Sequence, residues 1–416
     1  MARRNPSPPG TPPWNQQVGS RLMVWFGANA RPLPWRGDYH PYRVWVAETM
    51  AQQTRMETLL PYYRRWMDRF PALEDVAAAT QEEVLKLWEG LGYYSRARNL
   101  HKAARMMVES GGEVPDTWEG LLALPGVGPY TAGAVGSTAF NLPVPAVDGN
   151  VGRVVARLAA LEEPPSGKEG KKQVAALAEG LVKAAGGRRG LSLGGPRALN
   201  QGLMELGSLI CRPVHPECAN CPLGLDCVAY TRGRQGDLPA AAHQPKAARV
   251  QGVMSLLGNQ GRWLVRRRPA KGVWGGLWEF PWLVLEPGES VLSGYHRLLE
   301  EMGLDGGPAG FKPVGGAGYP PQNLGQVRHG LTHLHFTWDC LLGRLDETDP
   351  AVILAGEAVD GPYTARWATP DELARLPLGR PNHKALALLG QPLDVDHQGW
   401  SHHVSLMNVQ AHKEPL

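Results

Sequence analysis

Residues 124–132 read LPGVGPYTA, and this stretch predicts how the first half of the chain folds. Gly126 and Gly128 permit a tight turn and a close backbone approach, and Pro129 fits the first position of a following helix. N–H groups exposed at such a turn suit an anion such as a DNA phosphate. A plain helix-to-helix turn is the alternative, because a lone G-x-G is a weak motif. The candidate DNA contacts here are Gly126, Val127 and Gly128.

The sequence on both sides of this turn is helical in pattern. Apolar residues recur every three to four positions, as in VWVAETMAQQTRMETLLPYYRRW at residues 44–66. We therefore predict an all-α region over residues 15–230, with a helix-hairpin-helix at about 117–140. The proline-rich residues 1–14 are expected to form a disordered arm.

The second half of the chain has a different pattern. VQGVMSLL at 250–257 and LHFTWDCLL at 334–342 alternate or run apolar in strand-sized pieces, and HRLLEEMGL at 296–304 is helical. The chain is therefore expected to be multidomain, with an α+β domain after the helical region. The predicted boundaries are a linker at 231–248, the α+β domain at 249–390 and a disordered tail at 391–416.

Length and charge restrict the class of protein. The 416 residues imply two or three domains, and 43 Lys+Arg against 39 Asp+Glu give a net charge of only +4. A basic nucleic-acid coat is excluded, although a local basic patch is not. No apolar run approaches the roughly 20 residues of a bilayer span, and the N-terminus lacks the apolar core of a secretory signal. We therefore expect a cytoplasmic protein that does not span a membrane.

Four of the five cysteines crowd into one short segment with the spacing C-x6-C-x2-C-x5-C. Disulfide frameworks spread their cysteines along a chain, so this crowding predicts a metal centre. Thiolates suit structural zinc or an iron–sulfur cluster, and both remain open. The long first gap is unlike the C-x2-C of zinc ribbons and favours a [4Fe–4S] cluster. The proposed ligands are Cys211, Cys218, Cys221 and Cys227.

Two carboxylates stand out for their surroundings. Glu48 shares a helix face with Val44 and Ala51, so its carboxylate is expected to be desolvated. Desolvation raises the pKa of a carboxyl group, which can then act as a proton donor near neutral pH. An ordinary solvated glutamate is the alternative. Asp148 precedes an amphipathic stretch and suits a helix N-cap, which favours its ionised form. A neutral acid beside an anion is what cleavage of an N-glycosidic bond requires.

Five segments in order make the sequence recognisable. ETMAQQT at 48–54, GLGYYSRARNL at 90–100, LPGVGPYTA, VDGNV at 147–151 and the cysteine spacing together resemble the MutY family of adenine DNA glycosylases, over roughly Trp35 to Leu389. The resemblance implies a helix-hairpin-helix glycosylase with a [4Fe–4S] cluster and a Nudix-like domain that recognises 8-oxoguanine. The implied partner is double-stranded DNA carrying adenine opposite 8-oxoguanine or guanine.

The resemblance also assigns roles to residues. Glu48 corresponds to the acid that protonates adenine N7, and Asp148 to the carboxylate that stabilises, or transiently bonds to, the sugar C1′, supported by Asn150. Tyr130 stands where bifunctional relatives similar to endonuclease III carry a lysine, so hydrolysis without efficient strand cleavage is implied. The pocket for the extrahelical adenine is expected to be lined by Trp35, Arg36 and Gln201.

Other positions correspond to DNA contacts. An adenine that leaves the stack must be replaced, and the resemblance gives this wedge role to Gln53 and Tyr93, with Leu91 alongside. A buried aromatic is the alternative for Tyr93. Thr54 corresponds to a contact with 8-oxoguanine.

The second domain departs from the family pattern at two places. LTHLHF at 331–336 retains Thr332 and His333, but Leu331 stands where the family carries an aromatic residue. Thr332 could bond to 8-oxoguanine, whereas His333 alone could be an ordinary surface residue. In a Nudix hydrolase a glutamate-rich helix holds magnesium, and here Arg297 replaces one of its carboxylates. We therefore predict no nucleotide hydrolysis.

Two rival functions remain at this point. A bifunctional glycosylase of the endonuclease III type conflicts with Tyr130. A non-catalytic iron–sulfur protein that only binds DNA would have no need of both Glu48 and Asp148.

Overall fold

The computed structural model describes residues 8–186, 195–240, 247–259, 261–302, 304, 313–314, 321–345 and 364–390. These form two compact units. The helical unit comprises residues 1–79 and 98–244, and the Nudix-like unit comprises residues 80–97 and 245–416. Within the described ranges, no helix has both the length and the apolar character needed to cross a membrane.

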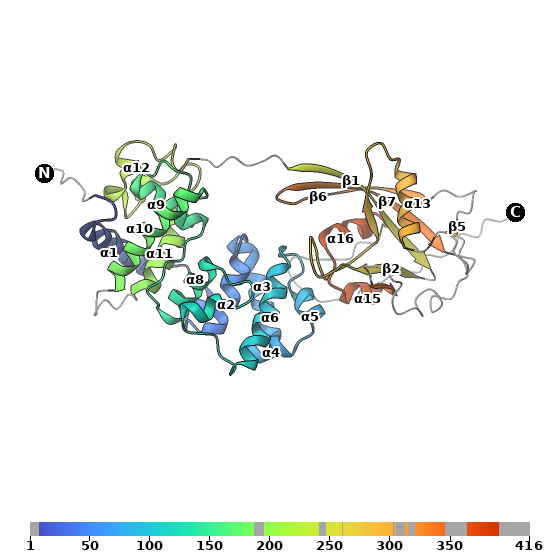
Figure 1. Cartoon of the computed structure of the whole chain (residues 1–416), viewed down its shortest axis with the longest axis horizontal. Helices are drawn as coiled ribbons and strands as arrows, with labels where there is room; N and C mark the ends of the chain where they lie inside the picture. The colour runs from blue at the N-terminus through green and yellow to red at the C-terminus, as the bar shows by residue number, and fades with distance from the viewer. Residues whose placement is uncertain are drawn as a thin grey trace. The chain divides into compact units, whose positions relative to one another are not determined.

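Helices build the first unit (Figure 1). Its longer members are α1 (Pro12–Asn29), α2 (Pro41–Ala51), α3 (Met56–Arg69), α6 (Ser95–Glu109), α8 (Pro129–Phe140), α9 (Gly149–Ala159), α10 (Lys168–Gly186) and α11 (Gly195–Leu209). Shorter ones are η1 (Pro34–Arg36), α4 (Leu73–Ala78), α7 (Trp118–Leu122), η2 (Cys218–Asn220), η3 (Gly224–Asp226) and α12 (Val228–Thr231). The predicted helical character of this region is confirmed.

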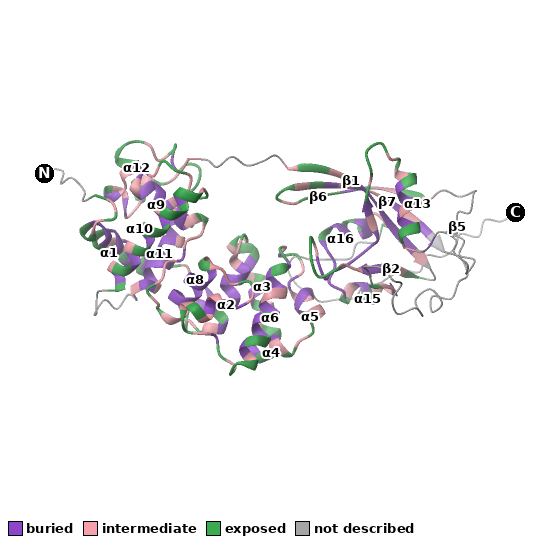
Figure 2. Ribbon diagram, viewed as in Figure 1, coloured by how far each residue is buried: buried purple, intermediate pink, exposed green. Residues whose placement is uncertain are grey.

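One core joins the N-terminal and C-terminal helices of this unit. α1, α9, α10 and α11 bury a shared cluster whose members include Trp14, Leu22, Val155, Leu181 and Leu199. Figure 2 shows buried residues along these helices. Helices far apart in sequence are thereby fixed against one another, because apolar burial is the main favourable term in packing.

The Nudix-like unit is a mixed sheet with helices on both faces. Its strands are β1 (Ala248–Asn259), β2 (Arg262–Arg267), β3 (Trp278–Glu279), β4 (Trp282–Val284), β5 (Pro313–Val314), β6 (Gln322–Gly330), β7 (Leu334–Leu345) and β8 (Thr364–Ala368). The central order is β3-β2-β1-β7-β5, with β1 and β7 parallel. The helices are α5 (Gln81–Leu87), α13 (Val291–Glu301), α15 (Pro370–Arg375) and α16 (Arg380–Ala387).

Two separate clusters cover the two faces of this sheet. Val253 packs with Leu298 of α13, whereas its neighbour Met254 packs with Leu386 of α16. Successive strand residues point to opposite faces, so β1 contributes to both clusters. Cys340, the one cysteine outside the clustered four, is fully buried in the second cluster.

Two predicted boundaries differ from the structure. Residues 12–14 are not part of a disordered arm, because Pro12 begins α1 and Trp14 is only 1% exposed. The linker at 231–248 is packed in part, since Leu238 lies buried against Ala160 and Ala229. Residues 80–97 are helical as predicted, with α5 and the start of α6, but by their contacts they pack in the compact unit that contains the sheet. The tail at 391–416 lies outside the described residues.

Candidate active site

The predicted hairpin is present, with α7 and α8 on either side of the turn. Gly126 adopts φ +78°, and a Cβ there would lie 2.6 Å from Asn99 Cβ, so glycine is required. Gly128 is the extended N-cap of α8, and a Cβ on it would meet nothing within 4 Å. Gly126 therefore makes the predicted turn, and the backbone of Gly128 is open to the approach of another group. Tyr130 is the second residue of α8.

The hairpin brings Tyr130 to Glu48. Glu48 lies on α2 and is buried, and the Tyr130 hydroxyl donates to its Oε2 at 3.2 Å. Burial raises the pKa of Glu48 to about 7; the bond from Tyr130 and the charge of Arg36 oppose this rise, and nearby Asp148 adds to it. The predicted desolvation of Glu48 is confirmed, so at neutral pH a substantial fraction of this carboxyl carries a proton.

Asp148 is the N-cap of α9, as predicted. Its Oδ1 accepts from Val151 N at 2.7 Å, and its Oδ2 accepts from Asn150 Nδ2 at 3.0 Å. Burial raises the pKa of Asp148, while these hydrogen bonds and Arg153 lower it. The sequence had predicted only the stabilising effect of the helix N-terminus, and missed the cost of burial. Asp148 thus has several donors for its negative charge, where Glu48 has mainly a tyrosine.

Arg153 holds Asn150 in place. Its Nη2 donates to Asn150 Oδ1 at 2.8 Å and to Gly207 O at 2.7 Å, and its Nε donates to Cys211 O at 2.8 Å. Asn150 therefore has its oxygen held by Arg153 and its amide directed at Asp148. Arg153 therefore fixes the orientation of Asn150, which in turn orients the carboxylate of Asp148.

The residues predicted to line the adenine pocket form a buried network. Arg36 Nε donates to Gln201 Oε1 at 2.9 Å, and Gln201 is 2% exposed. Trp35 is also buried, with its ring 4.9 Å from that of Tyr63. The structure thus brings Arg36 and Gln201 together, although 165 residues separate them.

Sequence reasoning missed two members of this network. Glu205 accepts from Arg31 Nε at 2.7 Å and from Arg36 Nη2 at 2.9 Å. Burial raises the pKa of Glu205, but the bonds from Arg31 and Arg36 outweigh it and hold the pKa below its usual value. Glu205 follows Gln201 by four positions on α11, and this spacing on one helix face was the available signal.

Both predicted wedge residues have left-handed backbones. Gln53 follows α2 with φ +56° and is exposed, and Tyr93 has φ +48° and is 48% exposed. Such values are uncommon in residues other than glycine and often mark functional sites. The buried-aromatic alternative for Tyr93 is therefore excluded. Leu91 is buried, and Thr54 is half-buried with its hydroxyl donating to Gln52 O at 3.3 Å.

In the Nudix-like unit, Tyr93 lies next to Thr332, the residue predicted to contact 8-oxoguanine. The hydroxyls of Tyr93 and Thr332 are 3.1 Å apart, within hydrogen-bond distance. His333 is exposed beside Thr332, and only its carbonyl has a partner, Ala248 N at 3.0 Å. On the degenerate Nudix helix, Arg297 binds Glu289 through two bonds of 2.7 and 3.0 Å and Glu301 through one of 3.2 Å. The guanidinium of Arg297 is therefore the ion-pair partner of both Glu289 and Glu301.

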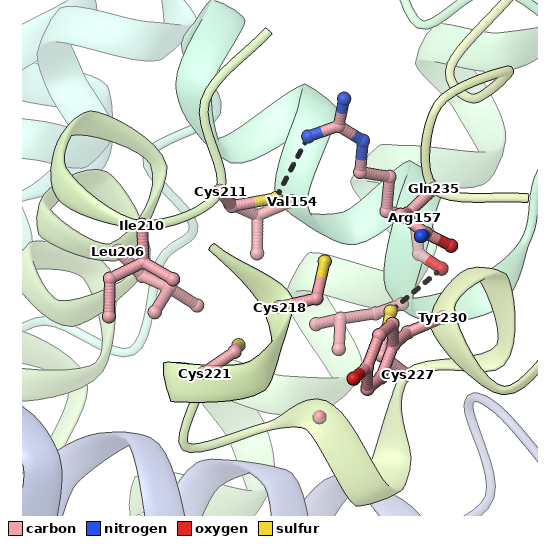
Figure 3. Close-up of a pocket in the computed structure, with 12 residues that line it drawn as sticks. Val154, Arg157, Leu206, Ile210, Cys211, Cys218, Cys221, Cys227, Tyr230 and Gln235 are labelled. Carbon is pink, nitrogen blue, oxygen red and sulfur yellow. Dashed lines mark hydrogen bonds between the residues drawn. The ribbon is translucent and has the colours of Figure 1, made fainter. Parts of the chain in front are cut away.

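The four clustered cysteines line one recess (Figure 3). Apolar side chains of Val154, Leu206 and Ile210 complete its wall, and Arg157 Nη1 lies 3.4 Å from Cys211 Sγ. Burial raises the pKa of Cys221 to about 12 and that of Cys227 to about 11. Among the described residues, no group of three or more His, Cys, Asp or Glu side chains is arranged to hold a metal ion.

Two family descriptions match the chain. The HhH-GPD superfamily of base excision DNA repair proteins matches residues 46–183, and the NUDIX domain matches residues 252–388. The first match contains Glu48, Tyr130 and Asp148. The second contains Thr332 and Arg297.

Individual proteins are similar over much of the chain. Adenine DNA glycosylase of Mus musculus is 34% identical over 406 residues, which covers 85% of this chain and 74% of the mouse protein. That of Homo sapiens is 34% identical and covers 84% of this chain and 70% of its own length. A solved thermostable thymine-DNA glycosylase, 28% identical, aligns with 53% of this chain and 98% of its own, with a TM-score of 0.45.

Proposed function

Because this chain belongs to the adenine DNA glycosylase family, we propose that Glu48, Tyr130 and Asp148 carry out the reaction of that family. The protein is a monofunctional glycosylase of base excision repair, which binds DNA and hydrolyses the N-glycosyl bond of adenine. The observation that carries the residue assignment is the Tyr130–Glu48 hydrogen bond of 3.2 Å at a carboxyl whose pKa is about 7.

The reaction needs a proton on the leaving base. Protonated Glu48 donates to N7 of adenine, the bond to C1′ breaks, and its electron pair leaves with the base. Positive charge develops on the sugar, and Asp148 stabilises it because Val151 and Asn150 keep this carboxylate ionised and oriented. Water then attacks C1′ and gives a proton to the Glu48 carboxylate, which leaves an abasic site and restores the acid. Tyr130 has no amine for a Schiff base, so the strand stays intact.

The base opposite adenine is read by a different group of residues. We propose that the preferred substrate carries adenine opposite 8-oxoguanine or guanine, with Thr54, Thr332 and His333 facing that base. Gln53 and Tyr93 fill the space that the extruded adenine leaves, supported by Leu91, and the hairpin residues 126–128 bind a phosphate. The exposure and left-handed backbone of Gln53 and Tyr93 support this role.

The cysteine recess supports a [4Fe–4S] cluster. A cubane offers one iron to each of four thiolates, so its ligands need not meet at one point. Raised thiol pKa values also mean that a bound cation is needed to keep these sulfurs ionised. The cluster would hold Cys211, Cys218, Cys221 and Cys227 together and so fix the loop that follows α11. Broad visible absorption near about 400 nm would support it, and a colourless zinc form would refute it.

Location and assembly are part of the proposal. An enzyme that repairs DNA acts where DNA lies, so we place it in a bacterial cytoplasm at the nucleoid, as a monomer. Cell fractionation and light scattering of the purified protein test these two statements.

One assay tests the activity. The protein is incubated with a duplex that holds adenine opposite 8-oxoguanine, and the products are analysed with and without hot alkali. Strand breakage only after alkali supports monofunctional excision. Breakage without alkali, together with borohydride trapping of enzyme on DNA, would instead support the endonuclease III type, and unaltered adenine would support a protein that only binds DNA.

A further inference from the structure

The loop that carries Tyr93 belongs to the Nudix-like unit although helical-unit sequence flanks it on both sides. Residues 80–97 form part of that unit, so the chain passes between the units at 79/80, 97/98 and 244/245. This segment contains α5 and the loop at 88–94. It was the least expected feature of the fold, and its contacts show what holds it.

Side chains at three points bind the segment to the rest of its unit. Trp278 Nε1 donates to Glu82 Oε2 at 2.8 Å near the start of α5. Lys86 Nζ donates to Leu376 O at 3.0 Å. Glu89 accepts from Lys86 Nζ at 2.6 Å and also bonds His383 Nε2 of α16.

We call Lys86, Glu89 and His383 the Glu89 bridge. Their side chains are 18%, 8% and 19% exposed, so solvent screens them little. Burial lowers the pKa of Lys86 and its contact with Glu89 raises it. Charge-assisted hydrogen bonds in such surroundings are among the stronger ones, and removing one partner takes away part of what compensates the burial of the others.

The bridge is adjacent to a loop with little freedom of its own. Trp88 Nε1 donates to Gly92 O at 3.1 Å, and Arg96 Nη2 donates to Leu91 O and Gly92 O at 3.3 and 3.2 Å. Arg96 also lies over the Tyr93 ring, 5.6 Å from its centroid. The loop thus joins Glu89, four positions earlier in the chain, to Tyr93, whose hydroxyl lies 3.1 Å from that of Thr332.

We propose that Glu89 and His383 are positioning residues for recognition of the base opposite adenine. They fix the Tyr93 loop to the Nudix-like unit, so that Tyr93 and Thr332 meet the DNA as one preassembled pair. Preassembly matters because a pair ordered only on binding loses affinity to the ordering cost. The inference rests on the proposed roles of Tyr93 and Thr332, and it extends them to two residues that touch neither base nor sugar.

The test compares affinity for two duplexes, with adenine opposite 8-oxoguanine and opposite guanine. Binding is measured in a Glu48→Gln background so that the adenine stays in place. Adding Glu89→Gln or His383→Ala should lower the ratio of the two affinities by about tenfold, the equivalent of about 1.4 kcal/mol. His383→Gln should restore part of the ratio, because its amide N–H reaches the position of Nε2. Glu113→Gln removes the same charge from an exposed site and should leave the ratio unchanged.

Amide hydrogen exchange separates positioning from loss of fold. In Glu89→Gln, exchange should quicken at residues 88–94 and stay the same in β1 and β7. An unchanged affinity ratio, equal falls on both duplexes, or no rescue by His383→Gln would each overturn the inference. So would a parent protein that does not distinguish the duplexes.

Failure of the proposed function gives a different result. Adenine release by the wild-type protein decides that function, whereas the affinity ratio is measured without release. Excision without discrimination would retain the function and overturn the inference. If the protein distinguishes the two duplexes through Glu89 but releases no adenine, the inference is retained and the proposed function is overturned.

Discussion

Glu48 of the helical unit and Glu289 of the Nudix-like unit lie in opposite surroundings. In the helical unit Glu48 is buried with a tyrosine as its hydrogen-bond partner, and its pKa rises to about 7. In the Nudix-like unit Glu289 is paired with Arg297, which lowers its pKa to about 2. A carboxyl left without a cation can exchange a proton near neutral pH, whereas a carboxylate bound to an arginine cannot. Of these two carboxyls, only Glu48 is therefore suited to act as an acid near neutral pH.

The largest expected effect comes from removing the acid. Glu48→Gln keeps the shape but cannot donate a carboxyl proton, so single-turnover excision should fall by about 10³-fold or more. DNA binding should persist. Glu289→Gln is the matched control in the other unit and should leave excision unchanged. Equal losses in the two variants would remove the distinction between the units.

The pH dependence of excision should report the same contrast. Glu48 must be protonated and Asp148 ionised, so kcat/KM should decline as pH rises through about 7. Because burial raises the pKa of Asp148, the acidic limb should begin above the usual range of an aspartate. Rates measured from about pH 4 to 9 would show both limbs. A rate that keeps rising above pH 8 would contradict a glutamic acid donor.

A smaller change should follow from Tyr130→Phe. The tyrosine hydroxyl lowers the pKa of Glu48 by bonding to its charged form. Its removal should therefore shift the basic limb to higher pH and change the plateau rate by only a few fold. A shift to lower pH would mean that the bond stabilises the neutral acid instead.

The smallest effect is expected on the Nudix-like side. Arg297→Gln removes partly exposed ion pairs, so the melting temperature should fall only slightly. The rate at which adenine opposite guanine is excised should stay the same. The wild-type protein with magnesium should release no pyrophosphate from nucleoside triphosphates, because Arg297 stands where a metal ligand is needed. Release of pyrophosphate would show that the two units both carry chemistry.

Local sequence patterns predicted the parts of the site that local structure determines. Pro41 opens the helix of Glu48, Asp148 caps α9, and Gly126 turns the hairpin, each within one or two helical turns of the residue concerned. Caps, turns and helix faces depend on neighbours in sequence, so they could be predicted.

Contacts between distant residues could not be predicted in this way. Arg31 and Glu205 are 174 residues apart, and Glu89 and His383 are 294 apart. Neither pair leaves a periodic pattern in the chain. The assignment of residues 80–97 to the Nudix-like unit depends on such contacts, which is why the sequence placed them with their neighbours.

The central claim is that Glu48 holds a proton near neutral pH while Glu289 does not. Infrared difference spectra between the wild-type protein and Glu48→Gln test it directly, through the carbonyl stretch of a protonated carboxylic acid. We predict that this band is present at pH 6, declines through about pH 7 and is absent from the difference spectrum of Glu289→Gln. Its absence from the Glu48→Gln difference at pH 6 would contradict the account.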